Sequence, residues 1–259
     1  MSRQAFFAGG PFAHHHRNLV GPPLPALDLS PFEPQRLIQA RHVWQERFRS
    51  EFRSVQVLTR FLHEVVGAGD PIDVYAGAVE LVRDEVRHAS LCASLCRAIG
   101  AQPFLPDPVE LRDPPQFLAA ELGERAMHTA LTMLVVNETI STCLIADLRG
   151  RCETPAVRFV IDATLADEET HGNWGLAYAQ AALQRFPVST KPQWRQLVGS
   201  VLAPHRQFAA TKRGTLADMP EPALAALGLS SPGRQAIVVD AALRGPVQSA
   251  LELLDLVPP

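Results

Sequence analysis

The sequence of 259 residues has little of what marks several large classes of protein. It has only four cysteines, and because no two of them form a C-x-x-C pair, we do not expect a zinc ribbon or a rubredoxin-type iron site. The formal net charge of -3 excludes a strongly basic nucleic-acid surface as the main theme. No apolar run approaches the roughly 20 residues that cross a bilayer, and residues 1–20 lack the unbroken apolar stretch of a signal peptide. We therefore expect a soluble cytoplasmic protein that binds neither nucleic acid nor membrane.

Signals for β-strands are also scarce, because apolar and polar residues nowhere alternate over a sustained run. Helical spacing of apolar residues instead predicts four long helices, over residues 35–66, 71–100, 116–149 and 155–186. The middle connection, residues 101–115, contains five prolines and is long enough to cross from one end of a bundle to the other. The pattern predicts an all-α fold, with a four-helix bundle over residues 35–187.

Two segments flank this predicted bundle. Residues 1–34 are rich in proline, glycine and phenylalanine, show no period, and are expected to form an arm. The tract His14–His16 in that arm either binds metal or is incidental. Residues 188–259 are expected to form shorter helices packed on the bundle as a cap or an oligomer surface. Their predicted breaks are at Pro204, Pro220, Pro232 and Pro246.

Two of the predicted helices each carry an E-x-x-H pair, Glu85 with His88 and Glu168 with His171. Residues three apart on a helix point to the same side, so each pair can bind one metal ion together. By number alone the pairs are weak support, because chance placement of the glutamates and the 9 histidines would give about half a pair. Their position matters more, since both pairs lie near the middle of a long helix on its apolar face.

The helix before each pair contributes one further acid on its apolar face, Glu51 and Glu138. The spacing from each acid to the following pair suits a chain that goes up one helix and down the next, so all six residues meet at one level. Four ionised carboxylates buried without partners would cost several kcal/mol each, and we expect no basic residue on these faces. Two divalent cations would neutralise the four charges. The alternative is a structural network of protonated acids.

The order Glu, E-x-x-H, Glu, E-x-x-H on four antiparallel helices resembles the ferritin-like superfamily of di-iron carboxylate proteins, and Asp84-Glu85-Val86-Arg87-His88 resembles its D-E-x-R-H segment. The resemblance implies a ferritin-like antiparallel four-helix bundle with a long crossover between the second and third helices and extra C-terminal helices. It implies that Glu51 and His88 bind one iron ion, that Glu138 and His171 bind the other, and that Glu85 and Glu168 bridge them. Manganese could replace iron.

Within this superfamily, the resemblance implies either oxygen activation or iron storage. We expect the first, a non-heme di-iron oxidase or oxygenase that uses O2 as co-substrate on a small organic molecule; the alternative is a ferritin-like ferroxidase without an organic substrate. Since no cofactor-binding fingerprint is present, electrons would come from an external donor. A homodimer suits such an enzyme. Thr142 and Thr164 are candidates for a substrate pocket, and Thr164 stands where related N-oxygenases use a further histidine ligand, which argues against that activity.

Four further residues are candidates for supporting roles. Asp84 and Asp167 each precede a bridging glutamate and could hold the histidine ligands by hydrogen bonds. Trp174 and Tyr178 follow His171 on the same helix and could relay electrons. Core packing is the alternative for both aromatic residues, because aromatic side chains dominate bundle interiors.

Overall fold

The structure is a computed structural model, and it describes residues 9, 10, 12–103, 114–215 and 220–258. Over these residues it contains helices and no β-strand, which confirms the predicted all-α class. The helices surrounding the predicted site are α2 (Pro34–Gly67), α3 (Ile72–Ala98), α5 (Leu122–Thr129), the π-helix η1 (Ala130–Glu138), α6 (Thr139–Arg149) and α7 (Pro155–Leu183). Pro34 and Pro155 begin α2 and α7, where a missing N–H costs no helical hydrogen bond.

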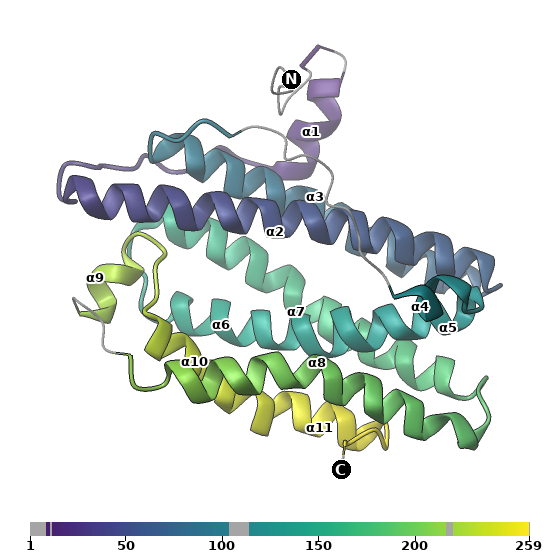
Figure 1. Cartoon of the computed structure of the whole chain (residues 1–259). Coiled ribbons are helices and arrows are strands. Elements are labelled where there is room, and N and C mark those ends of the chain that lie inside the picture. Colours follow the sequence, from purple (N-terminus) through teal and green to yellow (C-terminus); the bar gives the residue numbers. More distant parts are fainter. Residues whose placement is uncertain (1–8, 11, 104–113, 216–219, 259) are drawn as a thin grey trace.

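Contacts at the helix ends define how the chain runs. Near the start of α2, Arg41 Nε donates a 2.6 Å hydrogen bond to the carbonyl oxygen of Ile99, just after α3. At the other end of α2, Gly67 lies directly against Leu122, the first residue of α5, where a Cβ atom would clash. The chain therefore passes from one end of the α2–α3 pair to the other between α3 and α5 (Figure 1). Residues 104–113 of this connection lie outside the described residues.

The third predicted helix differs most from its expected form. The short helix α4 (Pro115–Ala119) comes first, and Ala120 and Glu121 then adopt extended backbone angles before the long helix starts at Leu122. From there the chain stays helical to Arg149, but its middle is wound as the π-helix η1. The predicted helix over 116–149 is therefore interrupted at Ala120 and Glu121, close to Gly123, which the sequence marks as a possible irregularity, and its middle has a π winding that was not predicted.

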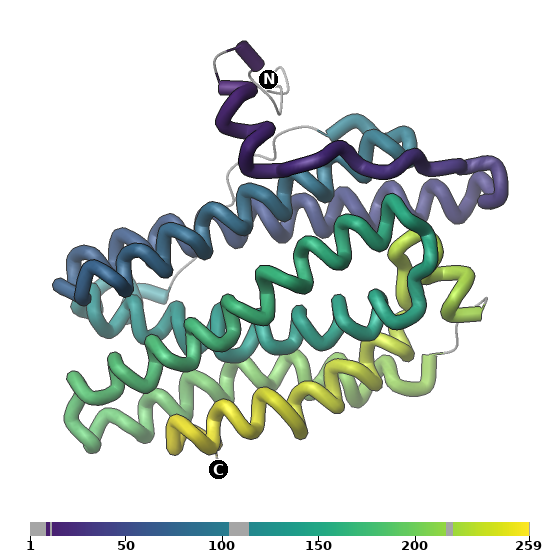
Figure 2. The backbone as a smooth tube through the Cα atoms, turned by 180° about the vertical axis from the view of Figure 1, so that it is seen from behind, coloured from purple at the N-terminus to yellow at the C-terminus, as the bar shows by residue number. Residues whose placement is uncertain are grey.

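Helices α8 (Lys191–Lys212), α10 (Pro232–Arg244) and α11 (Pro246–Leu253) form a layer on the α6 and η1 side of the bundle, opposite α2 and α3, which both views show (Figures 1 and 2). The 3-10 turn η2 (Val188–Thr190) precedes α8. The short helix α9 (Glu221–Ala225) lies instead near the start of α2, where Trp44 Nε1 donates a 2.9 Å hydrogen bond to the carbonyl oxygen of Leu227, just after α9. The predicted break at Pro204 is wrong, because α8 continues through it. The buried side chains Trp194, Val198 and Leu202 hold α8 on the bundle and offset the backbone hydrogen bond that proline removes. Pro220, Pro232 and Pro246 do lie at helix starts.

The N-terminal arm contains one regular element that the sequence pattern did not predict. Helix α1 (Phe12–Val20) includes His14–His16, so this tract does not lie in a loop. His14 Nε2 lies 3.1 Å from Asn18 Nδ2, one helical turn away. No side chain of α1 is buried, and the helix contacts the bundle at α3.

Two apolar clusters fill the interior and leave the middle of the bundle between them. One includes Leu81 of α3 and Tyr178 of α7, and the other includes Cys92 of α3 and Ile161 of α7. The predicted ligands on α3 and α7 lie between these positions in the sequence. The two E-x-x-H pairs therefore lie in the protein interior, enclosed above and below by apolar side chains.

The helical stretch Leu122–Arg149 corrects one expectation from the sequence. By length and composition it is apolar enough to cross a membrane, and it is the single such helix in the described residues. A core helix of a soluble protein passes the same test, so one such helix is weak support for a membrane span. Its residues Leu131, Leu134 and Val136 are fully buried inside the protein, which accounts for the apolar composition.

Candidate metal centre

The structure brings all six predicted ligands together. Glu51 comes from α2, Glu85 and His88 from α3, Glu138 from the last residue of η1, and Glu168 and His171 from α7. They form two overlapping groups, in each of which one oxygen or nitrogen atom per residue lies within 4.8 Å of the others. The first group is Glu51, Glu85, His88 and Glu168, and the second is Glu85, Glu138, Glu168 and His171. Glu85 and Glu168 belong to both groups.

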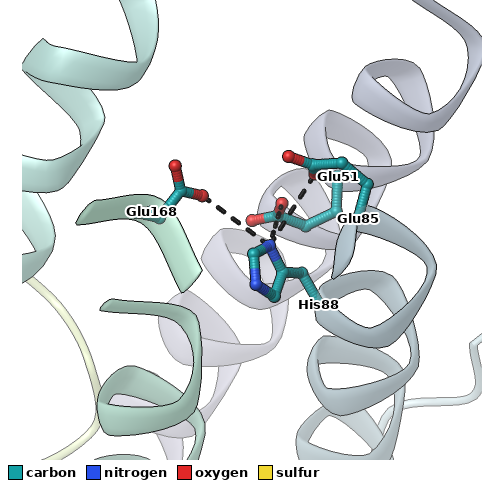
Figure 3. A group of neighbouring side chains, drawn as sticks. All are labelled: Glu51, Glu85, His88 and Glu168. Atoms are coloured by element: carbon teal, nitrogen blue, oxygen red, sulfur yellow. Dashed lines mark ion pairs between the residues drawn. The ribbon is translucent and has the colours of Figure 1, made fainter. Parts of the chain in front are cut away.

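The distances within the cluster suit a shared ion better than direct hydrogen bonds. His88 Nδ1 lies 3.8 Å from Glu51 Oε2, 3.8 Å from Glu85 Oε2 and 3.6 Å from Glu168 Oε1 (Figure 3). His171 Nδ1 lies 3.6 Å from Glu85 Oε1 and 3.7 Å from Glu168 Oε2. Two atoms that each lie about 2 Å from one metal ion are themselves about 3 to 4 Å apart.

Several oxygen and nitrogen atoms of the cluster that could bind a metal ion are buried and lack a hydrogen-bond partner among the described residues. They are both carboxylate oxygens of Glu85, Oε2 of Glu168, and Nδ1 of His88 and of His171. Apart from Glu51, each of the six residues is at least 96% buried. Native proteins rarely leave such atoms unpaired, because each costs its full desolvation energy. Converging carboxylate oxygens and imidazole nitrogens without partners fit one or more metal ions, so this cluster could hold a metal.

Each histidine is held from behind by an aspartate of the opposite helix. His88 Nε2 lies 3.1 Å from Asp167 Oδ2, and His171 Nε2 lies 3.3 Å from Asp84 Oδ2. Arg87 Nη1 also donates a 2.7 Å hydrogen bond to Asp167. An aspartate at Nε2 makes that nitrogen the donor and turns the lone pair of Nδ1 toward the cluster, as histidine ligands in metal sites require. The geometry agrees with the supporting role predicted for Asp84 and Asp167.

Burial and mutual repulsion dominate the electrostatics when no metal offsets them. Burial, together with the charges of Glu138 and Glu51, raises the pKa of Glu85 well above its usual value. Burial, followed by Glu138, Glu85 and Glu51, does the same to the pKa of Glu168. Burial alone would lower the pKa of His88, but Asp167, Glu85 and Glu51 outweigh it and raise the pKa to about 10. The metal-free cluster therefore holds protons that a metal ion would displace.

The π-helix η1 ends at Glu138, at the level of the cluster. A π-helix bonds each N–H to the carbonyl five residues back, so its side chains rotate relative to those of an α-helix, and such segments are frequent at functional sites. Thr142 Oγ1 donates a 2.8 Å hydrogen bond to the carbonyl oxygen of Glu138 just beyond it. Helical spacing placed Glu138 on the inner face correctly but contained no signal for the π winding.

Two cavities adjoin the cluster, and Glu51 borders both. One, of about 430 Å³, is also lined by Glu85, Glu138 and Glu168. The other, of about 270 Å³, lies on the other side of Glu51 and includes Thr164. Of the two residues predicted for a substrate pocket, Thr164 therefore lines a cavity beside the cluster. Thr142 lines neither of these two cavities and uses its hydroxyl group on the backbone of η1.

The aromatic residues after His171 extend away from the cluster along α7. Trp174 and Tyr178 stack with ring centroids 5.4 Å apart, and Phe61 packs edge-on against both. The Tyr178 hydroxyl donates a 3.1 Å hydrogen bond to Asp70 Oδ2. These contacts fit the core-packing alternative, while the electron-relay role stays a prediction.

Two features of the site were missed in the sequence. Arg47, four residues before Glu51 on α2, lines the smaller cavity together with it, so the expectation that the inner faces lack basic residues is wrong at this position. Its position one turn before Glu51 was the available signal. His128, which was not among the candidate site residues, lines the larger cavity.

Comparisons with protein-family models, with curated proteins and with solved structures give no match for this chain. The assignment of the site therefore depends on its own geometry.

Proposed function

We propose that the cluster holds two iron ions and that the protein is an O2-dependent oxidase or oxygenase of the ferritin-like type. The observation that carries the proposal is the convergence of unpartnered buried ligand atoms from α3 and α7 with the carboxylates of Glu51 and Glu138, next to cavities that Glu51 also lines. In this proposal Glu51 and His88 would hold one ion and Glu138 and His171 the other, while Glu85 and Glu168 would serve both, since they belong to both groups. Carboxylate and imidazole ligands suit iron or manganese.

When bound, the two ions would bind O2 and supply electrons for its reduction. The chain's own residues orient and enclose them. Asp84 and Asp167 fix the two imidazole rings, and the apolar clusters on either side limit water in the site. We assign the electron pair that an oxygenase turnover requires to a separate reductase. The substrate would be a small organic molecule, and the enzyme a cytoplasmic monomer or homodimer.

A ferroxidase that only stores iron would use the same six residues. The smaller cavity favours the enzyme over the ferroxidase. Its walls include the aliphatic side chains Leu144, Ile145, Leu148 and Ile161, which offer no ligand atoms to iron but can contact an organic molecule. Assembly size separates the two cases as well. Storage requires a large hollow assembly, whereas the proposed enzyme would elute as a monomer or dimer in size-exclusion chromatography.

The direct test loads the metal-free protein with Fe(II) under argon and then mixes it with O2 in a stopped-flow spectrometer and an oxygen electrode. We expect rapid O2 uptake with a transient visible absorption. With a chemical reductant present, oxidation should continue beyond the amount of iron supplied. If O2 uptake stops once the loaded iron is oxidised and iron keeps accumulating in large particles, the ferroxidase is correct and the oxygenase is wrong.

A further inference from the structure

The smaller cavity has its own chemistry, distinct from that of the metal cluster. It has a volume of about 270 Å³ and lies between α2, α6 and α7, with Ser230 and Gln235 of the C-terminal region along its border. Glu51 and Thr164 connect it to the cluster, because Glu51 is one of the six predicted ligands and Thr164 precedes Glu168 by one turn of α7. A molecule in this cavity would lie directly beside the metal ions.

Arg47 is the charged residue that sets the character of this cavity. Its guanidinium group lies over the ring of Trp44, with Cζ 4.5 Å from the ring centroid. The other half-buried arginines near the site have acid partners: Arg60 pairs with Glu64, Arg87 with Asp167, and Arg151 with Asp147. Among the described residues, no carboxylate lies within ion-pair distance of Arg47.

The charge of Glu51 acts on Arg47 although the two groups form no ion pair. The partly buried guanidinium has therefore lost hydration that this charge and the π contact replace only in part. Its planar group binds a carboxylate through two parallel hydrogen bonds, and this interaction strengthens where water is excluded. Arg47 also precedes Glu51 by four residues, just over one helical turn, which is a rise of about 6 Å along α2. An anion bound by Arg47 would therefore lie next to the metal ligand and not in its place.

The rest of the lining favours a ligand with an apolar body. Leu144, Ile145, Leu148 and Ile161 supply aliphatic surface, while Ser50 and Ser230 supply hydroxyl groups. A cavity of about 150 Å³ binds benzene, so about 270 Å³ suits a ligand of roughly ten non-hydrogen atoms. A free inorganic anion would fill only a small part of it.

We propose that this cavity binds the substrate, and that the substrate is a small monocarboxylic acid of about eight carbon atoms in total, with an apolar body. Arg47 binds the carboxylate, and the aliphatic side chains of α6 and α7 hold the hydrocarbon part. The identification of this ligand as the substrate rests on the proposed function. Binding of the ligand can be tested without turnover.

The test is a calorimetric titration of octanoate into the zinc-loaded protein, because zinc has no redox chemistry. The Arg47→Gln variant removes the charge, and the matched control Arg49→Gln removes an exposed arginine two residues away that pairs with Glu46. We expect octanoate to bind the wild type and Arg49→Gln equally. Arg47→Gln should weaken binding by about tenfold or more, and Arg47→Lys should restore part of it.

Two further probes complete the experiment: octanol, which has the apolar chain but no charge, and inorganic phosphate, which has charge but no apolar chain. Octanol should bind far more weakly than octanoate, and inorganic phosphate should not displace octanoate at comparable concentration. Equal binding of octanoate to the wild type and Arg47→Gln would overturn the inference. Equal binding of octanol, or displacement by phosphate, would also overturn it, because the cavity would then recognise only an apolar chain or only an anion.

The inference and the proposed function can fail separately. If iron-loaded protein consumes O2 but octanoate does not bind, the carboxylate site is wrong and the oxygenase survives. If octanoate binds in an Arg47-dependent manner but the iron-loaded protein does not react with O2, the proposed carboxylate site is correct and the proposed oxygenase activity is wrong. Repeating the titration on chelated protein shows whether binding needs the metal to offset the charge of Glu51, which also lines the cavity.

Discussion

Replacing both Glu85 and Glu168 with alanine is expected to abolish the proposed binding of two metal ions per chain. Both residues belong to both groups of converging ligands, so their loss leaves one carboxylate and one imidazole for each ion. A divalent ion held by two protein ligands and water binds orders of magnitude more weakly than one held by four or more. Metal content after dialysis, measured by inductively coupled plasma mass spectrometry, should fall from two ions per chain to none.

The matched control replaces Glu80 and Glu169 with alanine. Both residues lie on the same two helices as Glu85 and Glu168 but are exposed. Glu80 pairs with Arg83 at the surface, and Glu169 is adjacent to Glu168 in the sequence. This double variant has the same change in net charge and should keep both ions. The Glu85→Gln, Glu168→Gln variant preserves side-chain volume and guards against misfolding. Full metal content in both cluster variants would show that the ions bind elsewhere.

The second large effect concerns stability. In the metal-free protein, burial and neighbouring acids raise the pKa values of Glu85 and Glu168 above 4.5, and the surrounding carboxylates raise the pKa of His88 to about 10. All three groups then bind more protons in the folded than in the unfolded state. The two glutamates therefore lower the free energy of unfolding increasingly as pH rises above 4.5, their pKa in the unfolded chain. The contribution of His88 is complete below 6.5 and is lost as pH rises through about 10.

The free energy of unfolding of the chelated protein should therefore fall as pH rises from 5 to 9, by up to about 1.4 kcal/mol per pH unit for each proton involved. Metal loading should reverse the trend, because ions bind the deprotonated ligands and stabilise the folded state by about 2.7 kcal/mol at a free concentration of 100 times the dissociation constant. Thermal melts with chelator and with metal, taken across this range, measure both slopes. Identical slopes in the two forms would contradict the account.

The same pKa shifts predict that the Glu85→Gln, Glu168→Gln variant is more stable than the chelated wild type at neutral pH, although we expect it not to bind metal. Glutamine cannot ionise, so the variant avoids the free-energy cost of keeping these two glutamates protonated in the folded state. A cluster that lowers the stability of the metal-free protein has no structural role of its own, which agrees with a role in binding metal.

Much of the fold and the metal site could be predicted because helical spacing and metal ligation follow simple rules. Glu51, Glu85 and Glu168 stand on apolar faces where an acid has no structural use, and that contradiction identified them. Helix starts at Pro34 and Pro155 follow from proline chemistry. These are local properties that the order of residues contains.

Other features depend on contacts between distant segments and could not be predicted. The π-helix η1 packs against α7, and α8 runs through Pro204 with Trp194 and Leu202 buried against the bundle, and neither contact has a signal in the local sequence. The sequence pattern contained no sign of the role of Arg47, whose guanidinium lies over Trp44 and which lines the same cavity as Glu51. Pockets form from several helices at once, so their lining is not contained in any one sequence pattern.

The central claim is that two metal ions occupy one buried site between α2, α3, η1 and α7. Anomalous X-ray diffraction at the iron absorption edge, on crystals loaded anaerobically with Fe(II), tests it most directly. We predict two anomalous peaks about 3.5 to 4 Å apart, both flanked by Glu85 and Glu168, with His88 beside one and His171 beside the other. A single peak in the cluster, or peaks only at exposed histidines such as His14 and His15, would contradict the account.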